Sequence, residues 1–356
     1  MSKMKKVTAI AMALLLLLGL VGCSSTAESE PAETETQIAE QNAPADEVEI
    51  TQVGIVTDMG IDEAEWLQNL VKGLEDYVAN NNEGIDIKIV EAVDVAEYEP
   101  KVRALAEAGY SIIITMNSGM AAATTAVAAD YPDIRFGSHD GNIENLDSYS
   151  NISEFGLNRT ETGFLAGVAG AAMSETGVAG IVAGADEPVI NAIVAGWQQG
   201  LVWANPDIVD YVAYANSFTD PTIGKELALS LADKGCDVVG GAAGGTGVGA
   251  AQAAAEREIY YVAWDVHYPE VFTANQLELG SAVNWFDVMY LAFIDDVLAG
   301  NYQAGQRVEY GMTEGVCGFE YPDGSKMTDE AKAKVEEAMA AIKAGEITIS
   351  AEPLHK

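Results

Sequence analysis

The stretch VGIVTDMGIDEAEWLQNLVKGLE, residues 53–75, decides the fold. An apolar run ends on Asp58, the chain turns at Gly60, and an amphipathic segment rich in acids follows. A strand that turns into a helix in this way opens a βαβ unit and has the shape of a phosphate-binding loop. The turn carries no lysine, and acids at the start of a helix suit the helix dipole but repel an anion. The stretch therefore predicts one wall of a cleft for an uncharged ligand.

The same alternation of short β-branched runs and helical segments continues along the chain. Strands are predicted at residues 53–58, 85–93, 111–117, 134–140, 149–155, 178–184, 211–218, 237–244 and 260–265. Strands that alternate with helices indicate βαβ units on parallel sheets. The rhythm breaks at residues 144–163, which we interpret as the crossing between two α/β lobes of similar size. Two lobes also suit the length of 356 residues.

Several predicted strands end on polar, glycine or aromatic residues. In open α/β sheets, ligands bind at the carboxyl ends of the strands. We therefore expect these residues to converge on one cleft if the two lobes face each other: Asp58, Asn117 with Ser118, Asp140, Phe218, Gly244 and Asp265.

The formal net charge of −37 excludes two classes of partner. Nucleic-acid binding needs a basic surface that neutralises phosphates, and docking on anionic lipid headgroups needs one too. A small, uncharged ligand remains compatible with this charge.

The N-terminus predicts the compartment. A basic start, MSKMKK, precedes an apolar run of about 16 residues, which is typical of a secretory signal and short for a membrane span. The run ends in LVGC, residues 20–23, which resembles the bacterial lipobox and predicts a lipid on Cys23; the alternative is an uncleaved anchor helix. We expect a signal peptide at 1–22 and then, at 23–48, the lipidated cysteine and a disordered acidic tether. The protein would be extracytoplasmic and held at the bacterial cell membrane.

The two remaining cysteines, Cys236 and Cys317, form no CxxC pair, so the chain has neither a disulfide framework nor a zinc site. We favour two buried free thiols over a bridge between them.

The glycine-rich segment GGAAGGTGVG, residues 240–249, invites a nucleotide-binding interpretation. It lacks the lysine of a P-loop, and Ala250 stands in place of the third glycine of a dinucleotide fingerprint, although Asp265 lies at the right distance. We favour a helix start, including Gly245 and Thr246, whose free N–H groups bond a neutral ligand's oxygens.

Catalytic motifs are scarce. The three histidines are His139, His267 and His355, and neither HExxH nor GxSxG occurs. Asp265 and His267 could ligate a metal, but a solvated loop is the better interpretation. The acids could pair for glycoside hydrolysis, but solvated helix faces are the better interpretation. We expect a binding protein with no cofactor and no metal, rather than an enzyme.

Seven segments in register resemble the basic membrane protein (BMP) family of substrate-binding lipoproteins, whose purine nucleoside receptors feed ABC transporters. The segments are VGIVTDMGIDEAEW, the FLAG helix start at 163–167, GADEPVI with AGWQQG, NPDI, SFTDPTIGKELALSLADKGCDVV, AAGGTGVG, and the WD at 264–265. The resemblance covers nearly all of the chain after the tether.

The resemblance implies a type I periplasmic-binding-protein fold, with two Rossmann-like lobes and three hinge crossings near 155–160, 284 and 308. The N-terminal lobe would hold 49–156 and 285–308, and the C-terminal lobe 157–284 and 309–356. An ABC permease and ATPase would be the partners.

The resemblance also implies a site in which aromatic rings sandwich the base and acids hold the ribose. Trp66 stands where the family usually has phenylalanine, and Asp265 would bind the ribose. Phe218 and Trp197 are candidates for the second wall, or else core aromatics. The other residues expected in the site by position are Asp58, Asn117, Ser118, Asp140, Gly244, Gly245, Thr246, Asn284 and Trp285.

Two departures bear on the ligand. Leu67 replaces an asparagine of the family, and Asn284 replaces a lysine that holds a ribose oxygen, while Trp285 adds a ring. The resemblance implies a purine nucleoside, and the two departures give a free base, a riboflavin-like compound or a different polar ring as the alternatives. A sensing or adhesion lipoprotein of the same fold is the alternative to a transport role.

Overall fold

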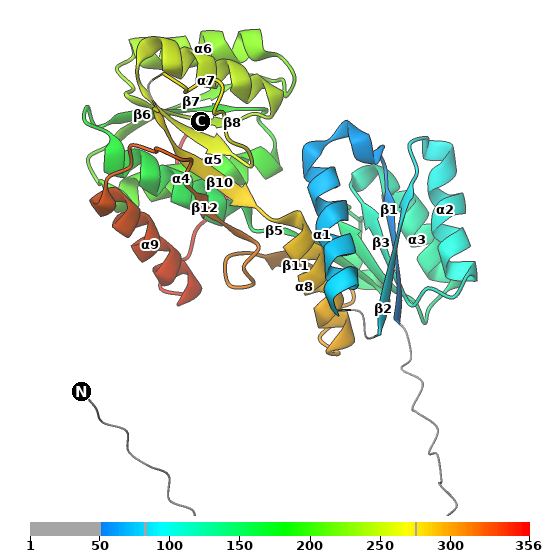
Figure 1. The fold of residues 1–356 in the computed structure, drawn as a ribbon. Helices are drawn as coiled ribbons and strands as arrows, with labels where there is room; N and C mark the ends of the chain where they lie inside the picture. Colours follow the sequence, from blue (N-terminus) through cyan, green and yellow to red (C-terminus); the bar gives the residue numbers. More distant parts are fainter. Residues whose placement is uncertain (1–50, 82–83, 275) are drawn as a thin grey trace, which may run out of the picture. The chain divides into compact units, whose positions relative to one another are not determined.

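The computed structural model describes residues 51–356 except 82–83 and 275 (Figure 1). The predictions for Cys23, the signal peptide and the tether therefore lie outside the described residues. The described chain folds into two six-stranded sheets flanked by helices.

The first sheet has the strand order β11-β5-β4-β3-β1-β2, and all its pairings are parallel. Its strands are β1 (Thr51–Thr57), β2 (Ile85–Glu91), β3 (Ile112–Met116), β4 (Arg135–His139), β5 (Ile152–Leu157) and β11 (Arg307–Tyr310). Its helices are α1 (Glu65–Asn81), α2 (Val95–Glu107), α3 (Ala121–Asp130) and α8 (Phe286–Leu298), with short 3-10 turns at Ile61–Glu63, Ser118–Met120 and Leu146–Ser148.

The second sheet has the order β12-β10-β9-β8-β6-β7, with β12 antiparallel to β10. Its strands are β6 (Val178–Ala183), β7 (Val209–Tyr214), β8 (Val238–Ala242), β9 (Tyr260–Trp264), β10 (Glu278–Asn284) and β12 (Cys317–Glu320). Its helices are α4 (Arg159–Met173), α5 (Pro188–Ala204), α6 (Pro221–Asp233), α7 (Gly245–Arg257) and α9 (Asp329–Lys343).

The chain passes between the two sheets three times: after β5, after β10 and after β11. The α8 helix packs against α1, and β11 pairs with β5, so the segment that follows β10 returns to the first sheet. The predicted fold class, two α/β lobes with three crossings, is confirmed.

Three strands escaped the sequence analysis: β10, β11 and β12. The strand β10 reads ELGSAVN, whose small residues carry little β-propensity, and β11 and β12 have four residues each. Burial selects β10 all the same, because six of its seven residues are buried between the flanking helices and strands.

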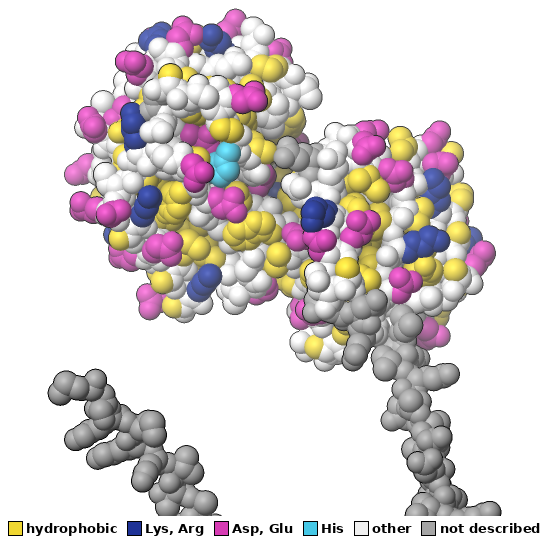
Figure 2. Space-filling model, in the orientation of Figure 1, with side chains coloured by type: hydrophobic (Ala, Val, Ile, Leu, Met, Phe, Trp, Pro, Cys, Tyr) yellow, Lys and Arg dark blue, Asp and Glu magenta, His cyan; other side chains and the backbone are white. Residues whose placement is uncertain are grey.

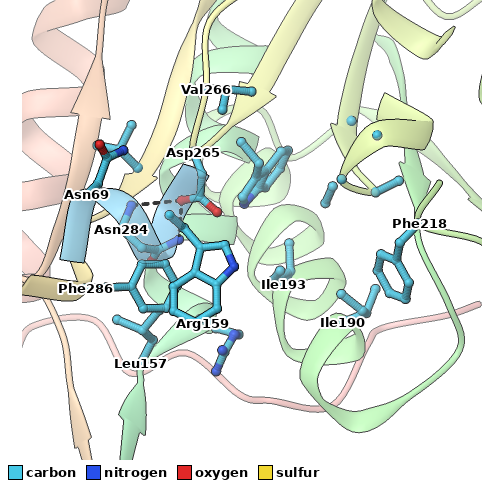
Figure 3. A pocket seen from close by; sticks show the side chains of 18 of the residues that line it. Asn69, Leu157, Arg159, Ile190, Ile193, Phe218, Asp265, Val266, Asn284 and Phe286 are labelled. Atoms are coloured by element: carbon cyan, nitrogen blue, oxygen red, sulfur yellow. Dashed lines mark hydrogen bonds between the residues drawn. The ribbon is translucent and has the colours of Figure 1, made fainter. Parts of the chain in front are cut away.

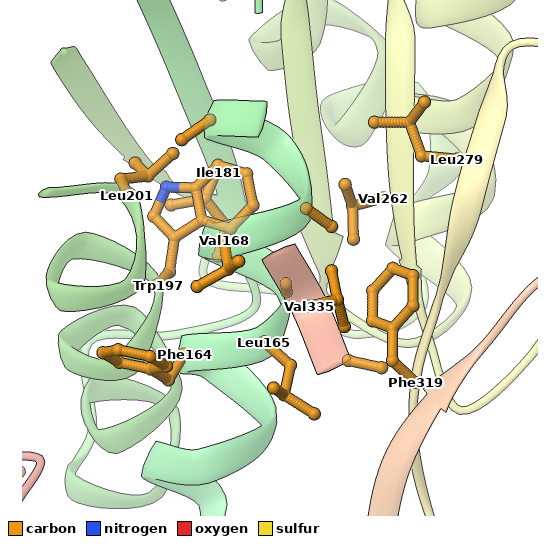
Figure 4. Close-up of a cluster of buried hydrophobic side chains, with 14 of the residues drawn as sticks. Phe164, Leu165, Val168, Ile181, Trp197, Leu201, Val262, Leu279, Phe319 and Val335 are labelled. Atoms are coloured by element: carbon orange, nitrogen blue, oxygen red, sulfur yellow. The ribbon is translucent and has the colours of Figure 1, made fainter. Parts of the chain in front are cut away.

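The helices α4 and α5 pack unusually closely. A Cβ atom on Gly163, Gly167, Gly196 or Gly200 would lie 2.1–2.2 Å from a backbone oxygen of the facing helix. Glycine at these positions lets the two backbones touch. Around this contact the largest buried cluster of the second lobe forms, with Phe164, Leu165, Val168 and Trp197 among its members (Figure 4).

Both predicted free thiols are confirmed. Cys236 and Cys317 are buried and unbridged. Burial raises the pKa of the Cys236 thiol to about 12, so this sulfur stays protonated and unreactive.

Acidic side chains are spread over both lobes on the face that Figure 2 shows.

Candidate functional site

A cavity of about 1050 Å³ is lined by residues of both lobes (Figure 3). The first lobe contributes the start of α1 and of α8, and the second lobe contributes the starts of α4, α5 and α7 and the ends of β8, β9 and β10. A cavity of this size accommodates a small organic ligand. Because the walls come from segments far apart in the sequence, the fold rather than any one motif makes the site.

Seven of the predicted site residues line this cavity. They are Trp66, Phe218, Gly244, Gly245, Asp265, Asn284 and Trp285. Six others, Asp58, Asn117, Ser118, Asp140, Trp197 and Thr246, lie outside its lining.

Aromatic rings form two opposed parts of the wall. Trp66 packs on Phe286 with ring centroids 4.9 Å apart and an interplanar angle of 39°. Phe218 lies on the side of the cavity away from Asp265 in Figure 3, and 40% of its surface is exposed. An aromatic residue left this exposed has stacking surface to offer.

Trp197 does not contribute to the walls. Its surface is 0% exposed, and it packs against Trp264 with ring centroids 6.3 Å apart. The close approach of α4 to α5 encloses this side chain, so it is a core aromatic of the second lobe.

Asp265 presents a carboxylate to the cavity from the end of β9. Both the backbone N–H and the side-chain amide of Asn284 donate to its Oδ1, at 3.0 and 2.8 Å. A carboxylate only accepts, so these bonds also orient the Asn284 amide. The Oδ2 atom has no hydrogen-bond partner among the described residues and is left for a ligand.

Two opposing effects act on the pKa of the Asp265 carboxyl. Desolvation by the surrounding protein raises this pKa. Its hydrogen bonds from Asn284 and the nearby Arg159 act in the opposite direction.

Strand ends in both lobes carry backbone strain. Asn117, Asp140 and Asp265 have positive φ angles of 62°, 49° and 59°, and Gly244 has a φ of 53°. These residues follow neighbouring pairs of strands, β3 with β4 and β8 with β9. Non-glycine residues in this region cost energy and cluster at functional sites.

The strand-end acids of the first lobe bond to protein groups. Asp58 accepts a hydrogen bond from the Asn117 amide at 2.8 Å. Asp140 accepts from Arg159 at 2.9 Å and from Arg307 at 2.7 Å. Burial alone would raise the pKa of Asp140, but the two arginines and His139 outweigh it and lower the pKa to about 2.

The glycine-rich turn before α7 divides between lining and support. Gly244 and Gly245 line the cavity. Thr246 is buried; its hydroxyl accepts from the Asp220 N–H at 3.0 Å, and its own N–H donates to the backbone oxygens of Phe218 and Ala243. Thr246 therefore holds the turn together.

Several lining residues were not predicted. Asn69 and Phe286 come from helices of the first lobe, Ile190 and Ile193 from α5, and Arg159 from the start of α4. Phe286 directly follows the predicted Trp285, which was the available signal. Arg159 lies in the segment 144–163, which the sequence predicts only as a crossing between the lobes.

His267 is a further lining residue, which the sequence suggests only as a metal ligand. Its Nδ1 lies 2.5 Å from Oε1 of the buried Glu278, whose Oε2 accepts from the Tyr268 N–H at 2.9 Å. Glu278 thus anchors the segment that follows Asp265. Among the residues that the structure describes, no group of three His, Cys, Asp or Glu side chains is placed to hold a metal ion.

No helix among the described residues is long and apolar enough to cross a membrane.

Two relatives of this chain are named as ligand-binding proteins. A purine-binding protein of Brucella abortus is 28% identical over 261 residues, covering 73% of this chain and 71% of that protein. The ABC transporter nucleoside-binding protein BmpA of Lactococcus lactis is 28% identical over 201 residues, 56% of each chain.

Among solved structures, an ABC transporter solute-binding protein of Conexibacter woesei superposes with a TM-score of 0.66 at 19% identity, covering 84% of this chain and 98% of that one. This likeness concerns the fold. The family model for PnrA-like ABC transporter substrate-binding proteins, Bmp, matches residues 50–352. The chain therefore belongs to the Bmp family of ABC transporter substrate-binding proteins.

Proposed function

We propose that this protein captures a purine nucleoside in the cavity between its lobes and delivers it to an ABC importer. The observation that carries the proposal is one cavity with aromatic walls at Trp66 and Phe218 and an unpaired carboxylate oxygen on Asp265. A permease would receive the ligand unchanged, and an ATPase would drive its import.

The aromatic walls suit the base. A flat heteroaromatic ring gains from apolar burial and from offset stacking on such rings, which together favour it over a sugar alone. Trp66 and Phe286 already form a tilted pair, so a ligand would extend an existing stack. Closure of the lobes around their crossings would bring the second aromatic surface onto the ring.

The carboxylate suits the ribose. Neighbouring hydroxyls donate hydrogen bonds to a carboxylate, and bonds to a charged acceptor are about twice as strong as neutral ones. Asn284 occupies only Oδ1 of Asp265, so Oδ2 is available for this purpose. The purine-binding and nucleoside-binding relatives support the same ligand class.

The proposal includes an extracytoplasmic position with a lipid on Cys23. This part rests on the LVGC motif and the acidic segment after it. Metabolic labelling with a radioactive fatty acid tests it: incorporation should occur in the native chain and should be lost in Cys23→Ala.

Calorimetric titration of the purified protein tests the ligand. Inosine, guanosine and adenosine should bind, and uridine and cytidine should bind more weakly because a pyrimidine offers less stacking surface. Free purine bases and riboflavin belong in the same panel. Binding of riboflavin alone, or of no nucleoside at millimolar concentration, would refute the proposal.

A further inference from the structure

Arg159 is a cation in the wall of the cavity. It is the first residue of α4, directly after the chain leaves β5, and its side chain is 17% exposed. Figure 3 shows it on the same side of the cavity as Asp265 and Leu157. A guanidinium at this depth is partly desolvated, so its unused donors gain from a ligand acceptor.

The hydrogen bonds of Arg159 leave most of its donors free. Nη2 donates to Oδ2 of Asp140 at 2.9 Å, and the other guanidinium nitrogens have no protein partner within the described part of the chain. A guanidinium carries five N–H donors in a fixed fork. The remaining donors are therefore available to a ligand in the cavity.

Asp140 does not depend on Arg159 alone. Arg307 donates to its other oxygen, Oδ1, at 2.7 Å and also lies 3.5 Å from Glu154. If Arg159 turned toward a ligand, Asp140 would keep a cationic partner. Asp140 of the first lobe thus positions Arg159 and leaves its other donors free for a ligand.

We propose that Arg159 is a ligand-contacting residue that works as a pair with Asp265. Asp265 supplies an acceptor and Arg159 supplies donors on the same side of the cavity. A hydroxyl both donates and accepts, so this pair selects a ligand edge with neighbouring hydroxyls. In terms of the proposed function, on which this inference rests, that edge is the cis-diol of ribose.

The electrostatics point the same way. Arg159 lowers the pKa of the Asp265 carboxyl and lines the cavity, whereas Arg307 lies outside the described lining. The two arginines therefore differ in what they reach, although both bond Asp140. This difference provides a matched control.

The experiment measures the affinity of the full chain for inosine and for 2′,3′-dideoxyinosine. The variants are Arg159→Gln, Arg159→Lys and Arg307→Gln, with thermal melting to confirm that each is folded. Arg159→Gln should weaken inosine binding by about 10- to 100-fold, the range for a lost hydrogen bond to a charged group. Its preference for inosine over the dideoxy analogue should shrink by a similar factor.

Arg159→Lys keeps the charge but loses the fork, so it should recover part of the affinity. Arg307→Gln should bind inosine within about twofold of the native protein, because the partners of Arg307, which are Asp140, Glu154 and Glu309, lie outside the cavity lining. Equal losses in Arg159→Gln and Arg307→Gln, or an unchanged dideoxy preference in Arg159→Gln, would overturn the inference.

A second measurement needs no ligand. Titration of ¹³C-labelled aspartates by NMR, with Asp265→Asn to assign the signal, should show a higher pKa for Asp265 in Arg159→Gln and no change in Arg307→Gln. If native protein binds no nucleoside, the proposed function fails, and this titration still decides whether Arg159 acts on Asp265. An unmoved Asp265 titration in Arg159→Gln rejects the pairing in either case.

Discussion

At the scale of single residues, Asp265 is subject to several structural constraints. Its backbone has a positive φ, its Oδ1 accepts two hydrogen bonds from Asn284, and its Oδ2 faces the cavity. The backbone strain is stored where the ligand group is presented. The asparagine at 284 thus has a clear task in this chain, which is to orient the carboxylate.

The substitution Asp265→Asn tests this arrangement. Asn284 would still donate to the new Oδ1, so the amide nitrogen would replace Oδ2 and present a donor where the carboxylate presents an acceptor. We expect nucleoside affinity to fall by roughly 10- to 100-fold, as for a lost charge-assisted bond. Calorimetry measures it, with the exposed Asp186→Asn as the control that should bind normally.

Unchanged affinity in Asp265→Asn would place the ligand elsewhere in the cavity. A loss of the same size in Asp186→Asn would indicate a general effect of removing negative charge.

The candidate site could be predicted in part from single residues. Strand-end rules identified Asp265 and Phe218, since the carboxyl ends of parallel strands meet at one edge. They did not find Arg159 or Asn69, which reach the cavity from helix positions whose orientation only the packing determines. Trp197 was a candidate for the second wall of the site, but close packing of α4 on α5 places its side chain in the core.

At the scale of elements, the contact between α4 and α5 is the most sharply specified. Gly167 faces the Trp197 carbonyl, and Gly200 faces the Phe164 carbonyl, so the glycines interlock. The FLAG and AGWQQG segments therefore have a packing reason as well as a place in the family pattern. The strands were harder to predict from the sequence, because burial rather than β-propensity makes β10 a strand.

The substitution Gly167→Ala should destabilise the protein. Its Cβ would lie 2.1 Å from the Trp197 oxygen, which belongs to the backbone and cannot move aside without separating the helices. We expect the free energy of unfolding to fall by about 1–3 kcal/mol or more, despite the higher helix propensity of alanine. Chemical denaturation measures this.

Val202→Ala on the exposed face of α5 is the control for Gly167→Ala and should change stability by about 0.5 kcal/mol or less. A Gly167→Ala protein as stable as the native one would show that α4 and α5 can separate at little cost.

At the scale of the whole molecule, stability should depend on pH through His139. This residue is buried among Phe155, Phe286 and Tyr290, and burial lowers its pKa from 6.5 to about 4. The unfolded chain therefore binds more protons than the folded one between these values. The stability that the neutral ring contributes is complete above pH 6.5 and is lost as the pH falls toward 4.

The loss amounts to roughly 3 kcal/mol, at about 1.4 kcal/mol per pH unit. It is measured as the difference in pH dependence between the native protein and His139→Gln, because other buried carboxyls titrate too. His139→Gln should flatten the curve between pH 6.5 and 4. Parallel curves for the native protein and His139→Gln would contradict the assignment.

The return of the chain to its first sheet has a consequence for biosynthesis. The edge strand β11 and the helix α8, which complete the first lobe, follow the whole of β6 to β10 in the sequence. A chain made from its N-terminus thus cannot finish its first lobe until residue 310 has emerged. Until α8 has been synthesised, the apolar face of α1 that packs against it has no partner within the chain. Any shielding of this face from water must then come from another molecule.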